Sequence, residues 1–551
     1  MFTKMTRNCF VSLLCLLIYF AFQFGSPTSS YAVKQGGVLK IAIGGQPSKM
    51  DPPNTTSSHD QQMMAHIYEV LLAYHYDGKT KMCTPKPILA EKWTLSKDGK
   101  VYTFYLRKGV KFHDGTPFNA TAVKFNIDRM MAEKPRTLYG RDVTGGIDHT
   151  EVVGEYTIKI HLSKPIAIFL HLLGDFKGAM VSPTALKKYG DDISRYPTGT
   201  GPFKFVKWAT GDYLEVEVFK EYWGGRAPLD GIVFRFVPDS NARINMLQMG
   251  EVDVALNIPI QDHERLRKTD KIDIISWPIA ALHHFYLDNA VPPTNELKVR
   301  QAIKLAIDTE AVTRDIFQGT AKPADSCLAP FTWGYFPANP HSYNPEKAKK
   351  LLEECGWIDR GGDGYRERDG KKLGLTIYAP LPDYMPMCGE SLLAIQEYLR
   401  KVGFECKVNA LDFSAFLSEY YRTLPERVQK EKDEKRGTAY FIDWGSRSDG
   451  WFTLYNKMNS RVWYPDKKHT SFYRNTEFDS LIDKAEVEVD PQKRFELYKK
   501  AQIIEAQDTP IIHLWVVSHA LGKRKYVHGI QAVPLPVADS HSHAREAWIE
   551  K

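Results

Sequence analysis

The segment from Glu91 to Met130 constrains the fold more than any other part of the chain. Side chains at odd and even positions of 101–106 alternate in character, as they do in a β-strand. A turn at 111–117 follows, and Asn119 or Thr121 then has the side chain to cap a helix with apolar residues up to Met130. The segment therefore predicts a strand, a turn and a helix in close succession.

This segment also carries a specific resemblance. From Trp93 to Phe125 it reads W-x-x-S-x-D-G-x-x-Y-x-F-x-L-R-x-G-V-K-F-H-D-G-x-P-F-x-A-x-x-V-K-F. This order resembles the signature of the family-5 extracellular solute-binding proteins, which include oligopeptide-, dipeptide- and nickel-binding subunits of ABC importers. Within it, we expect His113 and Asp114 only to shape a turn. Further segments similar to the family are 199–203 (GTGPF), 221–243, 299–308 and 343–357.

The resemblance implies an α/β fold, namely a two-lobed periplasmic binding protein of type II (Venus-flytrap) with an extra domain inserted in the first lobe. Two crossing strands would join the lobes. The implied boundaries are 36–77 with 197–288 and 518–551 for the first lobe, 78–196 for the extra domain, and 289–517 for the second lobe.

The N-terminus has the features of a signal peptide. Lys4 and Arg7 precede a nearly continuous apolar run, and Ser30 and Ala32 are the small residues that signal peptidase requires. We expect residues 1–32 to be removed and the mature protein to be periplasmic. An uncleaved membrane anchor is the alternative, because the apolar run is close to the shortest that spans a bilayer.

Charge and cysteine content narrow the class of protein. Loss of Lys4 and Arg7 lowers the net charge from +7 to +5, and no basic stripe with interleaved aromatic residues predicts nucleic-acid binding. Five cysteines remain after cleavage, an odd number, so at least one is not in an internal disulfide. They are Cys83, Cys327, Cys355, Cys388 and Cys406, and their pairing cannot be deduced from the sequence.

The character of the chain changes near Asp288. Strands dominate before it, whereas helices alternate with strands after it, which is typical of an α/β lobe. The predicted helices are 61–74, 240–249, 298–318, 345–355, 390–402, 414–422, 476–488 and 491–507. The predicted strands are 38–43, 156–162, 213–219, 232–237, a strand beginning at 251, 373–378, 406–410, 440–444 and 511–519.

Motifs for catalysis and metal binding are missing. The chain has no H-E-x-x-H, G-x-S-x-G or Walker-A sequence. Adjacent His283 and His284 would point to opposite faces of a strand, and residues 359–370 lack the twelfth-position glutamate of a calcium loop. We therefore expect a binding protein without enzymatic activity, metal or cofactor.

The candidate binding residues lie where the resemblance places a cleft between the lobes. A first-lobe loop offers hydroxyl groups and backbone amides, and a second-lobe loop offers a flat ring, a cation and a carboxylate. The two predicted hinge strands add aromatic side chains. These candidates are Thr55, Thr56 and Ser57; Trp444, Arg447 and Asp449; and His284, Tyr286 and Trp515.

One position departs from the peptide-binding members of the family. They carry an aspartate for the α-amino group seven residues before the position of Phe452, and here that residue is Gly445, with Asp443 two positions earlier. The resemblance still implies that the solute is a small peptide or a similar organic molecule, which a monomer delivers to an ABC permease. The alternatives are an opine-like or metal-chelate ligand, a sensory receptor, and an exported hydrolase.

Overall fold

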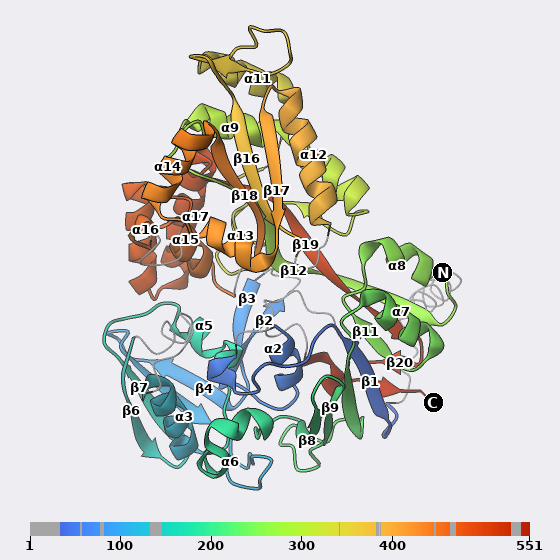
Figure 1. Ribbon diagram of the computed structural model, residues 1–551. Coiled ribbons are helices and arrows are strands. Elements are labelled where there is room, and N and C mark those ends of the chain that lie inside the picture. The colour runs from blue at the N-terminus through green and yellow to red at the C-terminus, as the bar shows by residue number, and fades with distance from the viewer. Residues whose placement is uncertain are drawn as a thin grey trace, which may run out of the picture.

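The computed structural model describes residues 33–55, 58–77, 82–132, 146–340, 342–381, 385, 387–445, 448–462, 470–530 and 542–550. Its main feature is a sheet of eleven strands that runs through both lobes (Figure 1). The strand order is β17 (Glu405–Leu411), β16 (Gly374–Pro380), β18 (Gly437–Gly445), β12 (Ile272–Leu287), β19 (Ile511–Arg524), β11 (Val254–Leu256), β1 (Val38–Ile43), β10 (Gly231–Phe236), β9 (Tyr213–Val218) and β8 (Phe203–Ala209), with β13 (Lys322–Pro323) paired to β19.

Strands β12 and β19 join the lobes. They are antiparallel and stay paired from Ile272↔Arg524 to Tyr286↔Ile511, with one irregularity between Pro278 and Leu282 and a second between His283 and His284. Proline has no backbone N–H to donate, so a break in the ladder is expected beside it. Beyond the break, β12 gains β18 as its second neighbour. The mixed α/β fold with two crossing strands agrees with the fold class predicted from the sequence.

The first lobe forms around β1, which pairs in parallel with both β10 and β11. Helix α7 (Ser240–Met249) coincides with its predicted bounds. The Asp239 side chain accepts a hydrogen bond from the Ala242 N–H at its start, and Gly250 ends it with a left-handed backbone. Helices α2 (Ser58–Met64) and α8 (Ile260–Arg267) come from the two segments of the chain that supply these strands of the first lobe.

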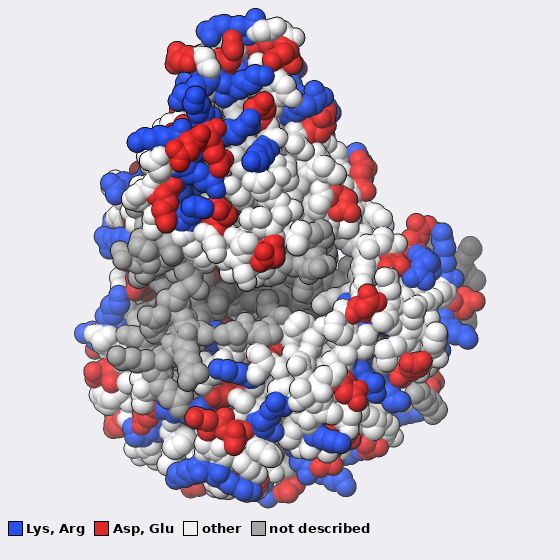
Figure 2. All heavy atoms as spheres, in the orientation of Figure 1, with Lys and Arg blue, Asp and Glu red and all other residues white. Residues whose placement is uncertain are grey.

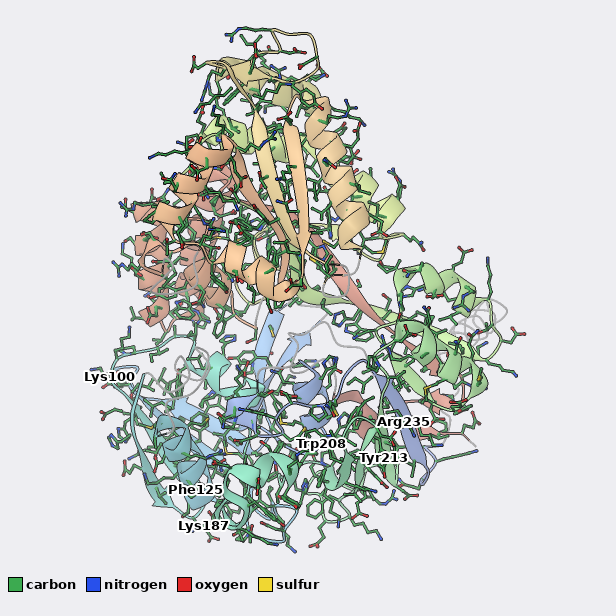
Figure 3. The ribbon with its side chains drawn as sticks, viewed as in Figure 1. Lys100, Phe125, Lys187, Trp208, Tyr213 and Arg235 are labelled. Carbon is green, nitrogen blue, oxygen red and sulfur yellow. The ribbon has the colours of Figure 1, made fainter. Side chains whose placement is uncertain are left out.

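The inserted segment has its own antiparallel sheet, with strand order β4 (Ala90–Leu95), β5 (Val101–Leu106), β7 (Thr157–Leu162) and β6 (Ile147–Gly154). Even-numbered residues of β5 are buried and odd-numbered ones are partly exposed, which confirms the predicted alternation. Asn119 caps α3 (Ala120–Ala132) through the Ala122 N–H. Lys187 of α6 (Pro183–Tyr189) lies 6.0 Å from the ring centre of Phe125 of α3 (Figure 3). The paired strands β2 (Leu72–Asp77) and β3 (Met82–Pro87) lead into this sheet.

The family signature has a structural role, because its turn docks onto the GTGPF segment. The His113 N–H donates to the Gly199 carbonyl at 2.9 Å, and the His113 ring contacts the Gly199 N–H and the Gly201 carbonyl. Asp114 accepts hydrogen bonds from Ser182 and Thr116. A Cβ on Gly199 would lie 2.3 Å from the Ile67 carbonyl oxygen, so only glycine fits. The turn predicted at His113 and Asp114 therefore also joins the extra domain to the first lobe.

The second lobe surrounds β16, which pairs in parallel with β17 and β18. Its helices are α9 (Leu297–Ala306), α10 (Thr309–Ala311), α11 (Pro345–Glu354), α12 (Cys388–Lys401), α13 (Phe413–Tyr420), α14 (Leu424–Glu434), α15 (Trp451–Met458), α16 (Thr476–Val487) and α17 (Pro491–Asp508). The five remaining cysteines are all thiols rather than disulfides. Throughout the described ranges, no helix has the length and apolar character needed to cross a bilayer.

Two predicted helices have other bounds in the structure, and some helices were not predicted. The helix predicted over 298–318 is interrupted because Ile307 is extended. Asp308 then caps a new helix, α10, by accepting a hydrogen bond from the Ala311 N–H. The helix predicted over 61–74 ends at Met64, because the apolar run from Leu72 pairs with β3 instead. Helix α14 was not predicted, although its capping box, formed by a threonine and a glutamate at its start, is a recognised sequence signal.

Candidate functional site

The surface is hollowed between the upper and lower parts of the molecule (Figure 2). The hinge strands pass from the second lobe into the first beside this hollow (Figure 1). Strand β18 ends at the same place, because its last residue, Gly445, pairs with Ala281 within the irregular stretch of β12. The end of β18 therefore lies where a solute between the lobes would meet the second lobe.

Asp443 is the acidic residue of this strand end. Because side chains alternate along a strand, Asp443 lies on the same face of β18 as Phe441. In the pairing of β18 with β12, Asp443 lies opposite His283. The residue is partly exposed, but its Oδ1 atom is inaccessible and accepts no hydrogen bond from any residue in the described part of the chain. Burial raises the pKa of the Asp443 carboxyl to about 6.

The buried surroundings of Asp443 disfavour the ionised form of its carboxyl group. The Cys388 thiol at the start of α12 has a pKa raised to about 12, first by burial and then by the charge of Asp443. A carboxylate in such a place needs a donor or a cation, because an unpaired buried charge is strongly unfavourable. An ammonium group of a bound molecule would supply both.

A second feature is a contact between the extra domain and the second lobe. His171 of α5 (Phe169–Leu173) has its Nδ1 atom 3.1 Å from Ser448 Oγ and its Nε2 atom 3.2 Å from Asp449 Oδ2. Its ring stacks on Tyr74 at 3.9 Å between ring centres. Burial lowers the pKa of His171 to about 3, and Arg494 offsets the attraction of Asp449. The neutral imidazole of His171 therefore joins the extra domain to the second lobe.

A surface contact reinforces this one. The Ala167 N–H donates to the Glu486 carbonyl at 2.8 Å, and the Lys164 ammonium lies 2.8 Å from the Glu486 carboxylate. Buried side chains from β5 and α3 also belong to the same hydrophobic cluster as those of α15, α16 and α17. The extra domain and the second lobe are therefore in direct contact in this structure.

Asp449 is used inside the protein. Its Oδ1 atom accepts hydrogen bonds from the Trp451 N–H and the Tyr498 hydroxyl, each at 2.8 Å, and its Oδ2 atom lies 3.1 Å from Arg494. The side chain is completely buried. In this arrangement Asp449 holds the start of α15 and exposes no oxygen to a solute.

The hinge candidates also lie among protein partners. The Trp515 indole donates to His283 Nδ1 at 2.9 Å, and Tyr286 packs edge to face on Tyr420. Trp515 is fully buried and Tyr286 is 2% exposed, so neither forms a surface for a ligand in this arrangement. His284 is also buried, with its Nδ1 atom 2.9 Å from the Nδ1 atom of His513.

The remaining candidates are only partly described. Thr55 is buried and its hydroxyl donates to Asp60 at 3.0 Å, which helps to shape the loop before α2. Thr56, Ser57 and Arg447 lie outside the described residues, as does the side chain of Trp444. His171 was missed by sequence reasoning, because no motif marks it. Asp443 had a signal, an acid within the apolar run of β18.

Comparison with known proteins places this architecture. A family model described as "Bacterial extracellular solute-binding proteins, family 5 Middle" matches residues 84–464. The glutathione-binding protein GsiB of Salmonella choleraesuis is 32% identical over 500 residues, which cover 90% of this chain and 92% of the relative.

Solved structures are similar over nearly the whole chain. The periplasmic binding protein DppA of Helicobacter pylori, solved with the peptide STSA, has a TM-score of 0.74 and 27% identity over 94% of this chain and 99% of its own. NikZ of Campylobacter jejuni, solved with Ni(L-His), has a TM-score of 0.76 and 25% identity over 93% of this chain and 99% of its own. The ligands named for these three proteins are glutathione, a peptide and a nickel–histidine complex.

Proposed function

Because the chain belongs to family 5 of the bacterial extracellular solute-binding proteins, the substrate-binding subunits of ABC importers, we propose that its solute is a short peptide of about the size of glutathione. The peptide would be held between the lobes beside the end of β18. It would then pass unchanged to the membrane permease.

Asp443 carries this proposal. Its Oδ1 atom is buried and accepts no hydrogen bond from the described residues, and burial raises its pKa to about 6. The ammonium group of a peptide would give this oxygen a charged donor and favour the ionised form of Asp443. Asp443 thereby takes the amine-binding role for which Gly445 has no side chain.

A carboxylate of the same solute needs a cation. Arg447, two residues after the end of β18, is the residue we propose for it, since a guanidinium binds a carboxylate through two parallel hydrogen bonds. Glutathione has an ammonium group and carboxylates, and the relative at 32% identity is named for binding it. A zwitterionic peptide suits an acid and an arginine in one cleft.

The setting of this function follows from the N-terminus and the fold. We propose export through residues 1–32 with cleavage after Ala32, and a monomer that works in the periplasm. The solute is bound without chemical change, so the same molecule should be recovered intact after incubation with the protein. A hydrolase would instead release fragments.

Calorimetry on the ligand-free protein tests the solute class. The titrants are glutathione, a dipeptide, nickel–histidine and an opine. Asp443→Asn keeps the shape of the side chain and removes its charge, so affinity for a peptide should fall roughly ten- to hundredfold. Asp270→Asn, at an exposed aspartate, is the matched control and should bind normally. Binding of nickel–histidine or the opine without any peptide would reject the proposal.

A further inference from the structure

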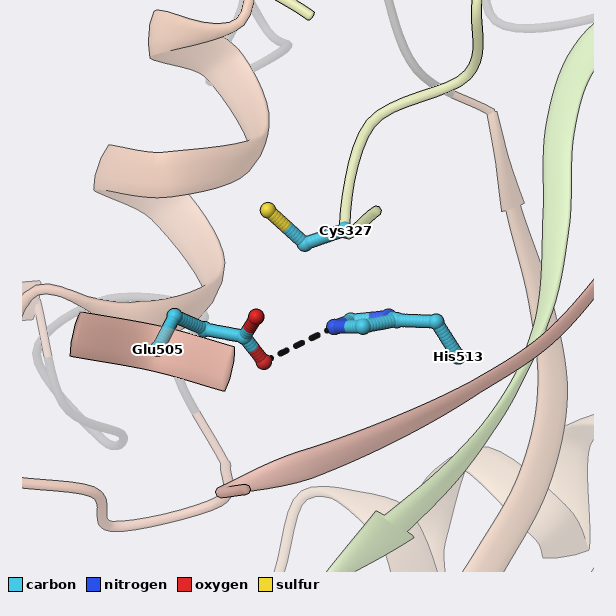
Figure 4. A group of neighbouring side chains, drawn as sticks. All are labelled: Cys327, Glu505 and His513. Carbon is cyan, nitrogen blue, oxygen red and sulfur yellow. Dashed lines mark hydrogen bonds and ion pairs between the residues drawn. The ribbon is translucent and has the colours of Figure 1, made fainter. Parts of the chain in front are cut away.

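Three metal-binding side chains meet in the interior of the second lobe. They are Cys327, which follows β13, Glu505 of α17 and His513 of β19 (Figure 4). Their ligand atoms all lie within 4.8 Å of one another. Each residue is almost completely buried. The cluster brings together parts of the chain that are up to 186 residues apart, and no sequence motif marks it.

Glu505 has one oxygen that the protein does not use. Its Oε1 atom is 2.9 Å from His513 Nε2, but its Oε2 atom has no hydrogen-bond partner among the residues that the structure describes. Figure 4 shows this second oxygen on the side of the Cys327 sulfur. Buried polar atoms almost always have a partner, so an unpaired carboxylate oxygen here indicates a missing one.

A second histidine orients the ring of His513. Its Nδ1 atom is 2.9 Å from the Nδ1 atom of His284, which is also buried. If His513 donates its Nδ1–H to His284, its Nε2 atom presents a lone pair to the cluster. A second hydrogen bond of this kind orients the ring and selects the tautomer that binds a metal.

We propose that Cys327, Glu505 and His513 form a binding site for one zinc ion, with water as the fourth ligand. A thiolate, an imidazole and a carboxylate are all zinc ligands, whereas calcium and magnesium prefer oxygen alone. The ion balances the charges of the thiolate and the carboxylate, so the buried site is neutral overall. Binding releases the thiol proton and the proton shared by His513 and Glu505.

The site is separate from the proposed solute position. His284 and His513 are partners in the register of β12 and β19, whereas Asp443 lies opposite His283, the next residue along β12. Neighbouring residues of a strand point to opposite faces of the sheet. The zinc would thus tie a hinge strand to α17 and to the loop after β13, on the other side of the sheet from Asp443.

One cation, Lys304, interacts electrostatically with Glu505. The charge of Glu505 acts on the Lys304 ammonium, which donates its hydrogen bond to Asn339 Oδ1. Lys304 therefore reduces the local negative charge without occupying the ligand positions. Zinc binding should still be stronger than that of magnesium, because only zinc uses the thiolate and the imidazole.

Metal analysis of the full-length exported protein, purified without a histidine tag, tests the proposal. The protein is stripped with a chelator, exposed to Zn²⁺ or Co²⁺ and passed over a desalting column. One metal ion should remain per chain, and the cobalt form should show an intense thiolate-to-cobalt absorption band. Cys327→Ser should lose this band and at least tenfold in affinity. Cys388→Ser, at a buried cysteine outside the cluster, should keep both.

A second measurement uses only the wild-type chain, in case Cys327→Ser does not fold. Alkylation of Cys327 during partial unfolding is followed by peptide mass spectrometry, with Cys388 as the internal reference. Zinc should slow alkylation of Cys327 at least tenfold relative to Cys388. Equal protection of both cysteines, a cobalt form without the thiolate band, or a stripped protein that retains no metal would each overturn the proposal.

Discussion

Acid should weaken the joint between the extra domain and the first lobe, because that joint depends on a neutral histidine. The Nε2 atom of His113 donates to the Gly201 carbonyl at 2.9 Å, and its Nδ1 atom accepts from the Gly199 N–H at 3.3 Å. Protonation would place a hydrogen on Nδ1, directly against another N–H donor. Burial lowers the pKa of His113 to about 4, with nearby Lys204 adding to the effect and Asp114 opposing it.

The size of the effect follows from the difference in pKa between the two states. The unfolded chain binds this proton near pH 6.5 and the folded chain near pH 4. The stabilisation is complete above pH 6.5 and is lost as the pH falls toward 4, by about 1.4 kcal/mol per pH unit. At pH 4.5 the loss attributable to His113 is therefore roughly 2–3 kcal/mol.

Urea unfolding of the wild type and of His113→Asn at pH 7.5, 5.5 and 4.5 measures this contribution. At pH 7.5 the variant should be less stable by roughly 1–3 kcal/mol, since asparagine cannot reach both glycines. From pH 7.5 to pH 4.5 the stability of the wild type relative to the variant should fall by roughly 2–3 kcal/mol, because asparagine does not titrate. His75→Asn, at an exposed histidine, should match the wild type. If the free energies of unfolding of the wild type and the variant differ by the same amount at all three pH values, the reasoning is refuted.

Three further substitutions test other contacts. Gly199→Ala should destabilise the protein by roughly 1–3 kcal/mol in thermal unfolding, because the new Cβ would lie 2.3 Å from a carbonyl oxygen, whereas Gly389→Ala meets nothing within 4 Å and should be neutral or stabilising. Asn119→Ala should cost about 1 kcal/mol through loss of the cap of α3, and Asn119→Asp should restore most of it. His171→Ala should make the ligand-free protein more extended in small-angle scattering, and unchanged dimensions would contradict its role in joining the extra domain to the second lobe.

The sequence predicted regular elements well where local signals agreed. The alternation of β5 and the bounds of α7 depend on neighbouring residues and on a cap at Asp239, all visible in one stretch of chain. The helix expected over 298–318 failed because a single extended residue, Ile307, breaks an otherwise amphipathic run. Asp308, which caps the next helix, was the local signal for this break.

The candidate site was harder to predict, because side-chain partners come from distant segments. Trp515 and His283 are 232 residues apart, yet they share a hydrogen bond that places the indole in the core. Asp449 is similarly engaged by Tyr498 and Arg494. From the sequence, a polar or aromatic residue near a hinge looks the same whether it faces a cleft or a partner.

Native mass spectrometry of the protein purified from the periplasm tests the central claim most directly. The account predicts that the wild-type chain carries one small amine-containing organic solute, released intact on denaturation, and that the load is much reduced in Asp443→Asn but not in Asp270→Asn. An equal load on Asp443→Asn and wild type, or a solute without an amine, would contradict the account.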